Sequence, residues 1–346
     1  MGLILNVHTL AWVGGVVLLV IIVRDCFNAL MVPGRVRRRL RFVPVYFQFT
    51  WAAWASVARR IRAQARRERM LSVYGPFAVL CLIALWAAGI LVGFGLLQFG
   101  LVPDATGSDV PDYLCTSGAR IFTLGAEESA NSTTLSKGLI IIEAGTGLGL
   151  ITTVITYLPV LYQLFSRRET HVILLDERAG TPVRASSLIC LHSQRNAINR
   201  LSVLIASWEQ WSAEVLESHV SYPMLSYYRS QHSDESWLAA MAVMMDTCAL
   251  RIAGADVVDA FQADRTLAMC IKALRNISQV LRITPAKRYG DRLSRTDFFE
   301  LAEQLRQSGI HIDESGVWER LPCVRDSYEP LLAALADHLL IELPPG

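Results

Sequence analysis

Three apolar segments in the first half of the sequence are each long enough to cross a lipid bilayer as a helix. They lie at about residues 9–32, 75–102 and 137–165. Crossing roughly 30 Å of hydrocarbon takes about 20 helical residues, and a lone spanning segment must be helical to satisfy its own backbone N–H and C=O groups. No comparable segment follows residue 166, so the sequence predicts a membrane part followed by a larger soluble part.

Composition and cysteine usage agree with this division. Hydrophobic residues make up 52% of the 346 residues, more than an ordinary soluble chain contains. The seven cysteines are scattered, without a C-x-x-C pair or a histidine at metal-ligand spacing, which favours reduced thiols. The first apolar segment lacks a basic leader and a small-residue cleavage site, so we expect it to remain as a membrane helix.

The distribution of arginine predicts how the helices are oriented. Eleven arginines, from Arg35 to Arg69, lie between the first two apolar segments against the single acid Glu68. Between the second and third segments, five acids face only Arg120. Because positively charged loops stay in the cytoplasm, we expect the N-terminus outside and the C-terminal domain inside a bacterial inner membrane. The expected parts are a first membrane helix, a basic interfacial segment, a membrane module and a cytoplasmic domain, at residues 1–33, 34–73, 74–166 and 167–346.

The uncharged segment 42–58 allows two interpretations. It is nearly long enough to span the bilayer, but spanning would carry one arginine cluster across the membrane. The alternative, which we expect, is a helix in the inner headgroup layer with Tyr46, Trp51 and Trp54 at the interface. The basic segment Arg35–Arg69 predicts anionic lipid as a partner rather than nucleic acid.

Residues 103–136 join two membrane helices yet differ from a hydrophilic loop. A helix is predicted from Pro111 and Asp112, since proline suits the first turn and a carboxylate suits the helix N-terminus. The helical pattern then ends in Thr123-Leu124-Gly125.

This arrangement resembles the pore module of the tetrameric potassium-channel superfamily. The resemblance implies an all-α membrane protein with an outer helix at 75–102, a pore helix at about 111–122, a filter that begins at Thr123 and an inner helix at 137–165. The basic segment after Asp25 and the segments 157–169, 217–223 and 229–237 also resemble bacterial two-transmembrane proteins of the potassium-channel family.

The expected filter departs from the Gly-Tyr-Gly continuation of that family. After Thr123, Leu124 and Gly125 come Ala126, Glu127 and Glu128. In four copies the two glutamates would form a carboxylate ring that attracts monovalent or divalent cations. The alternative interpretation is that they belong to a solvated outer loop.

The third apolar segment carries gate-like features. Its small residues permit close helix approach or bending, and its proline removes a backbone hydrogen bond. These residues are Gly145, Gly147, Gly149 and Pro159. Ordinary small-residue packing between membrane helices is the alternative.

Charged residues also occur inside the expected spans. Glu143 would be costly facing lipid, so we expect it to be paired with a polar group or to line an outer vestibule. For Arg24 and Asp25 we expect side chains that reach to the interface, with an intramembrane functional site as the alternative.

The C-terminal part predicts an all-α domain of roughly five helices. Apolar residues recur at helical spacing, and Pro223, Pro285 and Gly309 punctuate the pattern. The helices are expected near 185–220, 234–252, 256–283, 296–308 and 326–342. A short run at 171–175 is the one stretch with strand-like character.

Four polar residues of this domain form a candidate sensor. Glu214, Glu217, His219 and His232 lie around the Tyr222-Pro223 break, where histidine would give sensitivity to pH or metal. The alternative, which the lack of a ligand signature favours, is a set of ordinary core and surface residues.

These features together predict a homotetrameric cation channel, weakly selective and gated through its cytoplasmic domain. No cofactor is expected apart from permeant cations. A non-conducting membrane sensor or scaffold is the alternative function. An enzyme is not expected, because the sequence has no phosphate loop, nucleophile elbow or dinucleotide fingerprint.

Overall fold

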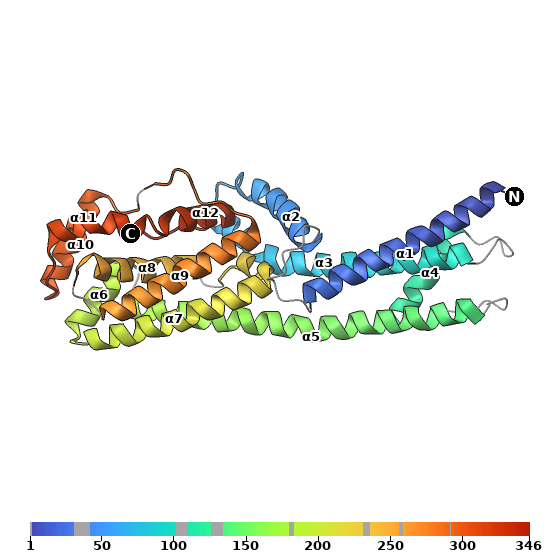
Figure 1. The fold of residues 1–346 in the computed structure, drawn as a ribbon, viewed down its shortest axis with the longest axis horizontal. Helices are drawn as coiled ribbons and strands as arrows, with labels where there is room; N and C mark the ends of the chain where they lie inside the picture. The colour runs from blue at the N-terminus through green and yellow to red at the C-terminus, as the bar shows by residue number, and fades with distance from the viewer. Residues whose placement is uncertain are drawn as a thin grey trace. The chain divides into compact units, whose positions relative to one another are not determined.

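The computed structural model has helices joined by turns and loops, and no strand occurs among the residues that it describes. These residues are 2–30, 42–101, 109–125, 134–179, 183–230, 236–255, 259–290 and 292–346. Figure 1 labels the elements. Their order is α1 (Gly2–Leu30), α2 (Phe42–Ala58), α3 (Gln64–Leu101), α4 (Val110–Ile121), α5 (Thr134–Ala179), α6 (Ala185–Gln194), α7 (Ile198–Ser221), the 3-10 helix η1 (Pro223–Tyr227), α8 (Trp237–Ala253), α9 (Ala260–Leu281), α10 (Arg295–Gln307), α11 (Glu314–Arg325) and α12 (Glu329–Leu339).

Three of the helices are long and apolar enough to cross a membrane. The candidate spans are Val7–Ala29 in α1, Gln64–Leu101 (α3) and Thr134–Ala179 (α5). The predicted all-helical class and the three candidate spans are thus confirmed, and the chain has the build of a membrane protein.

The chain divides into two compact units. One contains α1, α2 as far as Thr50, and Pro76–Tyr162; the other contains Trp51–Gly75 and Gln163–Gly346. We call the first the membrane unit and the second the C-terminal unit. The boundary between them falls inside α2, α3 and α5.

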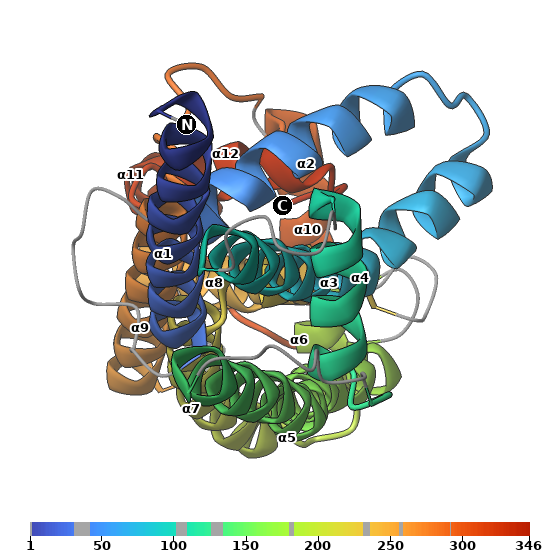
Figure 2. The ribbon, with the colours of Figure 1, turned by 90° about the vertical axis from the view of Figure 1, so that its right-hand side faces the viewer.

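In the membrane unit, α1 packs against α3 through small residues (Figure 2). A Cβ atom on Gly15 would lie 2.7 Å from the carbonyl oxygen of Gly93, and one on Gly100 would lie 2.7 Å from the Cβ of Trp12. Residues that come later in α1 thus meet residues that come earlier in α3, so the two helices are antiparallel. Such close backbone approach is typical of helix pairs in membranes.

Asp25 is buried within this unit. Its carboxylate accepts hydrogen bonds from the indole nitrogen of Trp86 at 3.0 Å and from the backbone nitrogen of Phe42 at 3.3 Å. Both donors lie outside α1, so the sequence near Asp25 gives no sign of them, and its position relative to the membrane interface stays a prediction. A buried carboxylate requires such partners.

The helix α2 runs beside the beginning of α3. In the membrane unit, the hydroxyl of Tyr46 donates to the carbonyl of Ala78 at 2.9 Å. In the C-terminal unit, the indole of Trp54 donates to the carbonyl of Met70 at 3.1 Å. That 42–58 lies on the bilayer rather than crossing it stays a prediction.

Trp51 departs from its expected place at the membrane interface. Its side chain is buried, and its indole nitrogen donates to the carbonyl of His338 at 2.8 Å. The rings of Tyr74 and Tyr227 lie 4.8 and 5.0 Å from it. Partners from the end of the chain cover this tryptophan, and neighbouring sequence gives no sign of them.

The C-terminal unit contains more helices than the roughly five predicted. Its core is formed by α7, α8 and α9, and α7 lies along α9 (Figure 1). The expected helix at 185–220 is two helices, because the chain turns at Asn196, whose φ of 51° lies in the left-handed region. The helix α11 was missed, since Pro322 lies inside it and few apolar residues mark it. The strand-like run at 171–175 is part of α5.

A buried charge cluster holds the C-terminal helices together. Asp246 on α8 accepts hydrogen bonds from Arg292 at 3.1 Å, from Arg325 at 3.0 Å and from the hydroxyl of Tyr328 at 2.6 Å. Glu329 lies 2.6 Å from Arg292 and 2.8 Å from Arg325. Two acids therefore balance two guanidinium groups, and burial beside Asp246 raises the pKa of Tyr328 well above its ordinary value.

Replacing Asp246 should destabilise this unit strongly. Asp246→Ala leaves two buried guanidinium groups with a single carboxylate, which typically costs roughly 3–5 kcal/mol of unfolding free energy. Thermal unfolding of the full-length protein in detergent, followed by tryptophan fluorescence, measures the loss. The matched control is Asp264→Ala, because Asp264 lies in an exposed ion pair with Arg265. Equal melting temperatures for the two variants would contradict the stabilising role of the cluster.

Candidate functional site

The short helix α4 lies between two candidate membrane helices and has well-defined ends. Asp109 and Asp112 form a capping box at its start, and Pro111 occupies its first turn. At its end, the backbone nitrogen of Leu124 donates to the carbonyl of Ala119 at 2.8 Å. The predicted helix at 111–122 is thus present as Val110–Ile121.

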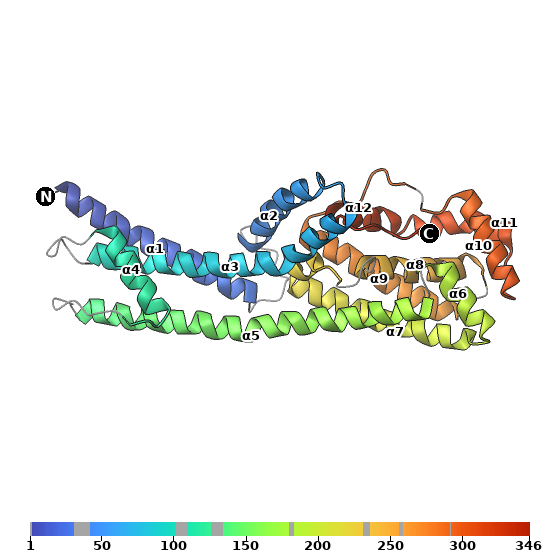
Figure 3. The ribbon, with the colours of Figure 1, turned by 180° about the vertical axis from the view of Figure 1, so that it is seen from behind.

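The helix α4 runs obliquely from α3 to α5 and contacts α3 before the end of that helix (Figure 3). The ring of Tyr113 lies 5.8 Å from that of Phe99, and the hydroxyl of Ser117 donates to the carbonyl of Leu91 at 3.0 Å. Leu91 lies ten residues before Leu101, where α3 ends. At 1.5 Å per residue, the contact of Ser117 with Leu91 therefore lies about 15 Å before the end of α3.

The end of α4 meets α5 at Gly147. A Cβ atom on Gly147 would lie 2.8 Å from the Cα of Ile121 and closer still to the carbonyl oxygen of that residue. Gly147 is the fourteenth residue of α5, which begins at Thr134. The contact therefore lies about 20 Å along α5. Of the three predicted glycines, Gly147 is the one where a side chain would clash with a described neighbour.

A buried polar cluster ties α3, α4 and α5 together, and we call it the Glu143 cluster. The carboxylate of Glu143 is fully buried and accepts hydrogen bonds of 2.5 Å from Gln98 and from Ser117. A guanidinium nitrogen of Arg120 lies 3.7 Å from it and donates to the Oε1 of Gln98 at 2.5 Å. Each of the three helices thus contributes at least one member.

The Glu143 cluster decides between the two expected roles of Glu143. The carboxylate is paired inside the chain, so in the described part of the molecule it does not line an open vestibule. Sequence reasoning missed Gln98 and Ser117, and it treated Arg120 as a loop charge. The signal available was the pairing of one base in a loop with one acid in the following span.

The first three expected filter residues follow α4 directly. Thr123 and Gly125 have positive φ angles of 59° and 77°, and Leu124 is 79% exposed. A left-handed backbone is costly for a β-branched residue such as threonine, and strain of this kind occurs preferentially at functional sites. Ala126, Glu127 and Glu128 lie outside the described residues.

One face of α5 is left uncovered by the other residues whose positions are described. A Cβ atom on Gly145 or Gly149 would meet nothing within 4 Å. Large apolar side chains on the same face are well exposed, among them Ile141 at 72% and Ile155 at 67%. Exposed residues recur every seven positions. One series is Gly138, Gly145, Thr152 and Pro159.

Pro159 lies within α5 without ending the helix. The predicted kink and the gate therefore stay predictions. The threonines of this helix donate back to their own backbone, as Thr152 does to Leu148 at 2.9 Å.

The three described residues of the candidate sensor, Glu214, Glu217 and His219, do not form one site. Glu214 pairs with Arg167 at 2.8 Å, and Glu217 accepts from Ser221 at 3.1 Å on the surface. His219 is buried, and His232 lies outside the described residues. No group of three or more possible metal ligands occurs among the residues with a described position.

His219 instead belongs to a buried arrangement around Arg168. The Arg168 guanidinium lies 2.8 Å from Glu169, 3.2 Å from the Nε2 of His219, 2.9 Å from the Leu225 carbonyl and 2.8 Å from the Tyr228 carbonyl. All three guanidinium nitrogens have a partner. Arg168 therefore fixes the segment around η1 to α5 within the C-terminal unit.

The protonation state of His219 follows from its partners. Its Nδ1 lies 2.9 Å from the carbonyl of Val215, which can only accept, so Nδ1 carries the proton and Nε2 accepts from Arg168. Burial, together with the adjacent Arg168, holds the pKa of His219 well below its ordinary value. A neutral histidine of this kind is a structural acceptor at neutral pH.

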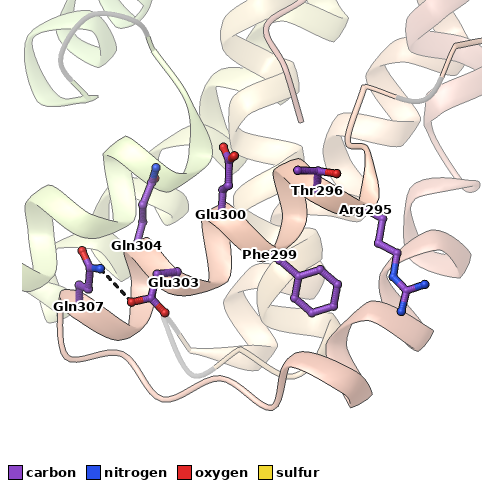
Figure 4. Close-up of a pocket in the computed structure, with 7 residues that line it drawn as sticks. All are labelled: Arg295, Thr296, Phe299, Glu300, Glu303, Gln304 and Gln307. Carbon is purple, nitrogen blue, oxygen red and sulfur yellow. Dashed lines mark hydrogen bonds between the residues drawn. The ribbon is translucent and has the colours of Figure 1, made fainter.

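A shallow hollow on α10 contains no catalytic arrangement. Figure 4 shows its lining residues, all from one helix: Arg295, Thr296, Phe299, Glu300, Glu303, Gln304 and Gln307. The ring of Phe299 stacks on Trp318 with centroids 6.4 Å apart. The hollow is an open helix face, and it is far from any predicted site residue in the sequence.

No protein-family model, no curated protein and no solved structure matches this chain. The resemblance to the potassium-channel superfamily therefore rests on the residues of the sequence.

Substitution of Gly147 should disrupt the contact between α4 and α5. In Gly147→Ala the new methyl group meets the backbone of Ile121, which cannot move aside as a side chain can. Overpacking of this kind costs about 1–3 kcal/mol, and we expect a lower melting temperature in detergent. Gly138→Ala is the matched control, because it adds the same group to the same helix with open space around it. A melting temperature for Gly147→Ala equal to that of the control would be inconsistent with the close contact.

Acidification should loosen the segment around η1 through His219. Because the fold lowers the pKa of His219, the folded state favours the neutral histidine. The contribution of this residue to the free energy of unfolding is therefore complete above a pH of about 6.5. It falls as pH decreases below that value, by at most about 1.4 kcal/mol per pH unit. Hydrogen exchange of residues 223–228, corrected for the intrinsic pH dependence, should show decreasing protection.

His219→Gln is the control for this pH dependence. Glutamine supplies an acceptor to Arg168 and does not titrate between pH 4 and 8. The variant should show protection that does not change with pH. An equally steep decline in the variant would assign the effect to another group.

Proposed function

We propose that this protein is a homotetrameric cation channel whose ion path lies on the symmetry axis between four copies of α4 and α5. The proposal places the protein in a bacterial inner membrane, with the N-terminus outside and the C-terminal unit in the cytoplasm. It joins the resemblance of the sequence to the geometry of the membrane unit.

The observation that carries the proposal is the depth at which α4 ends. The contact of Ser117 with Leu91 lies about 15 Å before the end of α3, which is half of a hydrocarbon core of roughly 30 Å. At Thr123 the chain leaves the helix, and its backbone groups there need polar partners. Non-helical backbone at that depth is tolerated where protein buries it or a water-filled path solvates it. The exposed side chain of Leu124 supports an open side at this point in the single chain.

The uncovered face of α5 supports assembly of several copies. Among the described residues of one chain, α3 and α4 cover one side of α5, and the opposite side carries glycine and threonine as well as large apolar residues. Small and hydroxyl-bearing residues are typical of faces that meet other helices or water. A face directed at lipid has no need of them.

The proposed selectivity is weak. The Ala126-Glu127-Glu128 sequence replaces the residues that complete a potassium filter, and a ring of carboxylates attracts cations without selecting one strongly. Monovalent and divalent cations are both candidates for permeation.

The C-terminal unit is the proposed source of gating. The helix α5 is continuous from Thr134 to Ala179, so residues of the proposed path and residues of the C-terminal unit belong to one helix. Arg168 fixes that helix to the segment around η1. A rearrangement of this segment would act on α5 directly.

Cation flux into liposomes that contain the purified protein tests the proposal. We expect potassium and sodium both to enter, and Glu127→Gln combined with Glu128→Gln to reduce entry at low salt by at least about tenfold, since the ring raises the local cation concentration. The reduction should be smaller at high salt because of screening. The control is Glu300→Gln combined with Glu319→Gln, which removes the same charge from the C-terminal unit.

Absence of flux at every tested voltage, pH and calcium concentration would contradict the channel and favour a non-conducting sensor or scaffold. Mass photometry of the same preparation gives the number of copies. A monomer would contradict the proposed path between copies.

A further inference from the structure

Six arginines surround the turn that joins α2 to α3, and only some of them are paired with carboxylates of the described residues. They lie close to the point at which the apolar part of α3 begins, and Figure 2 shows the turn between the two helices. The six are Arg59, Arg60, Arg62, Arg66, Arg67 and Arg69. All belong to the C-terminal unit.

Two of these arginines face carboxylates at the end of the chain. Arg67 donates to Glu342 at 2.7 Å, and Arg59 lies 4.0 Å from Asp337. The single acid of the segment, Glu68, lies 3.4 Å from Arg229 and is therefore already engaged. The end of the chain thus supplies negative charge to one side of the basic segment.

The other four arginines have no such compensation. Arg60, Arg62, Arg66 and Arg69 are exposed, and none has a side-chain hydrogen bond or ion pair with a residue whose position is described. Four like charges within ten residues repel one another, and an external anion would remove that repulsion.

The position of these four arginines selects the kind of anion. Arg66 and Arg69 share the exposed face of α3 with Val73, which is 50% exposed. Charge therefore changes to apolar surface within about 6 Å along the helix. An amphiphile with an anionic head and an apolar chain matches this change, whereas a nucleic acid or a free phosphate matches only the charged part.

The chemistry of arginine fits a phosphodiester. A guanidinium group donates through a planar fork that matches phosphate oxygens, and each basic group near an anionic leaflet adds attraction. The paired arginines Arg59 and Arg67 are directed to protein carboxylates, so the four free ones define the available surface.

We propose that Arg60, Arg62, Arg66 and Arg69 form a binding surface for the phosphate headgroups of anionic phospholipids in the inner leaflet. The apolar chains of the lipid lie along the face that begins at Val73. This inference does not depend on whether the protein conducts ions.

Native mass spectrometry of the full-length protein tests this surface. The protein is equilibrated in detergent with equal amounts of phosphatidylglycerol and phosphatidylcholine that carry the same acyl chains. Wild-type protein should retain phosphatidylglycerol preferentially. The quadruple variant Arg60→Gln, Arg62→Gln, Arg66→Gln and Arg69→Gln should lose at least about tenfold in that preference.

A second quadruple variant separates the site from net charge. Arg195→Gln, Arg200→Gln, Arg275→Gln and Arg288→Gln removes the same charge from exposed positions elsewhere in the C-terminal unit. It should keep the lipid preference. Both variants should melt at the wild-type temperature, because the eight side chains are exposed.

Three outcomes would overturn the proposal. The first is an unchanged preference in the first variant, and the second is an equal loss in both variants. The third is displacement of phosphatidylglycerol by millimolar glycerol phosphate, which would show that a soluble anion occupies the surface. Fluorescence anisotropy with labelled duplex DNA covers the remaining partner: loss of DNA binding in the first variant with intact lipid preference would assign the surface to nucleic acid.

Discussion

The carboxylate of Glu143 receives its partners from two other helices, and the arrangement of the membrane unit depends on this. A charged group inside a membrane helix is stable only when its partners are close, so α3, α4 and α5 must keep the positions that bring Gln98, Ser117 and Arg120 to it. The short helix α4 has too few residues to hold its place alone. The Glu143 cluster and the backbone contact at Gly147 determine where α4 ends, and with it where the expected filter begins.

The C-terminal unit uses the same device with different residues. Asp246 and Glu329 neutralise Arg292 and Arg325 between helices, while Arg168 is surrounded by Glu169, His219 and two carbonyl groups. Buried charges of this kind contribute little net stability but penalise arrangements in which a partner is missing. Both units therefore have cores in which the relative placement of helices is specified by polar contacts as well as by apolar packing.

Sequence reasoning succeeded where a pattern is local and failed where it depends on distant partners. Long apolar segments predicted the three candidate spans, and Pro111 with Asp112 predicted α4 within a residue at each end. The burial of Trp51 and Asp25 could not be predicted, because Tyr227, His338 and Trp86 approach only in the folded chain. The candidate sensor failed for the same reason: Glu214 and His219 lie on one helix, but their partners Arg167 and Arg168 direct them to separate environments.

The seven-residue recurrence on the uncovered face of α5 has a mechanical consequence. A straight α-helix has 3.6 residues per turn, so residues seven apart drift by about 20° for each repeat. Copies of α5 that keep Gly138, Gly145, Thr152 and Pro159 in mutual contact must wind around one another as a left-handed supercoil. Tilting one end of such a bundle changes its winding as well as its width. A force on the C-terminal end of α5 would then reach the level of Gly147 as a rotation rather than as a simple outward bend.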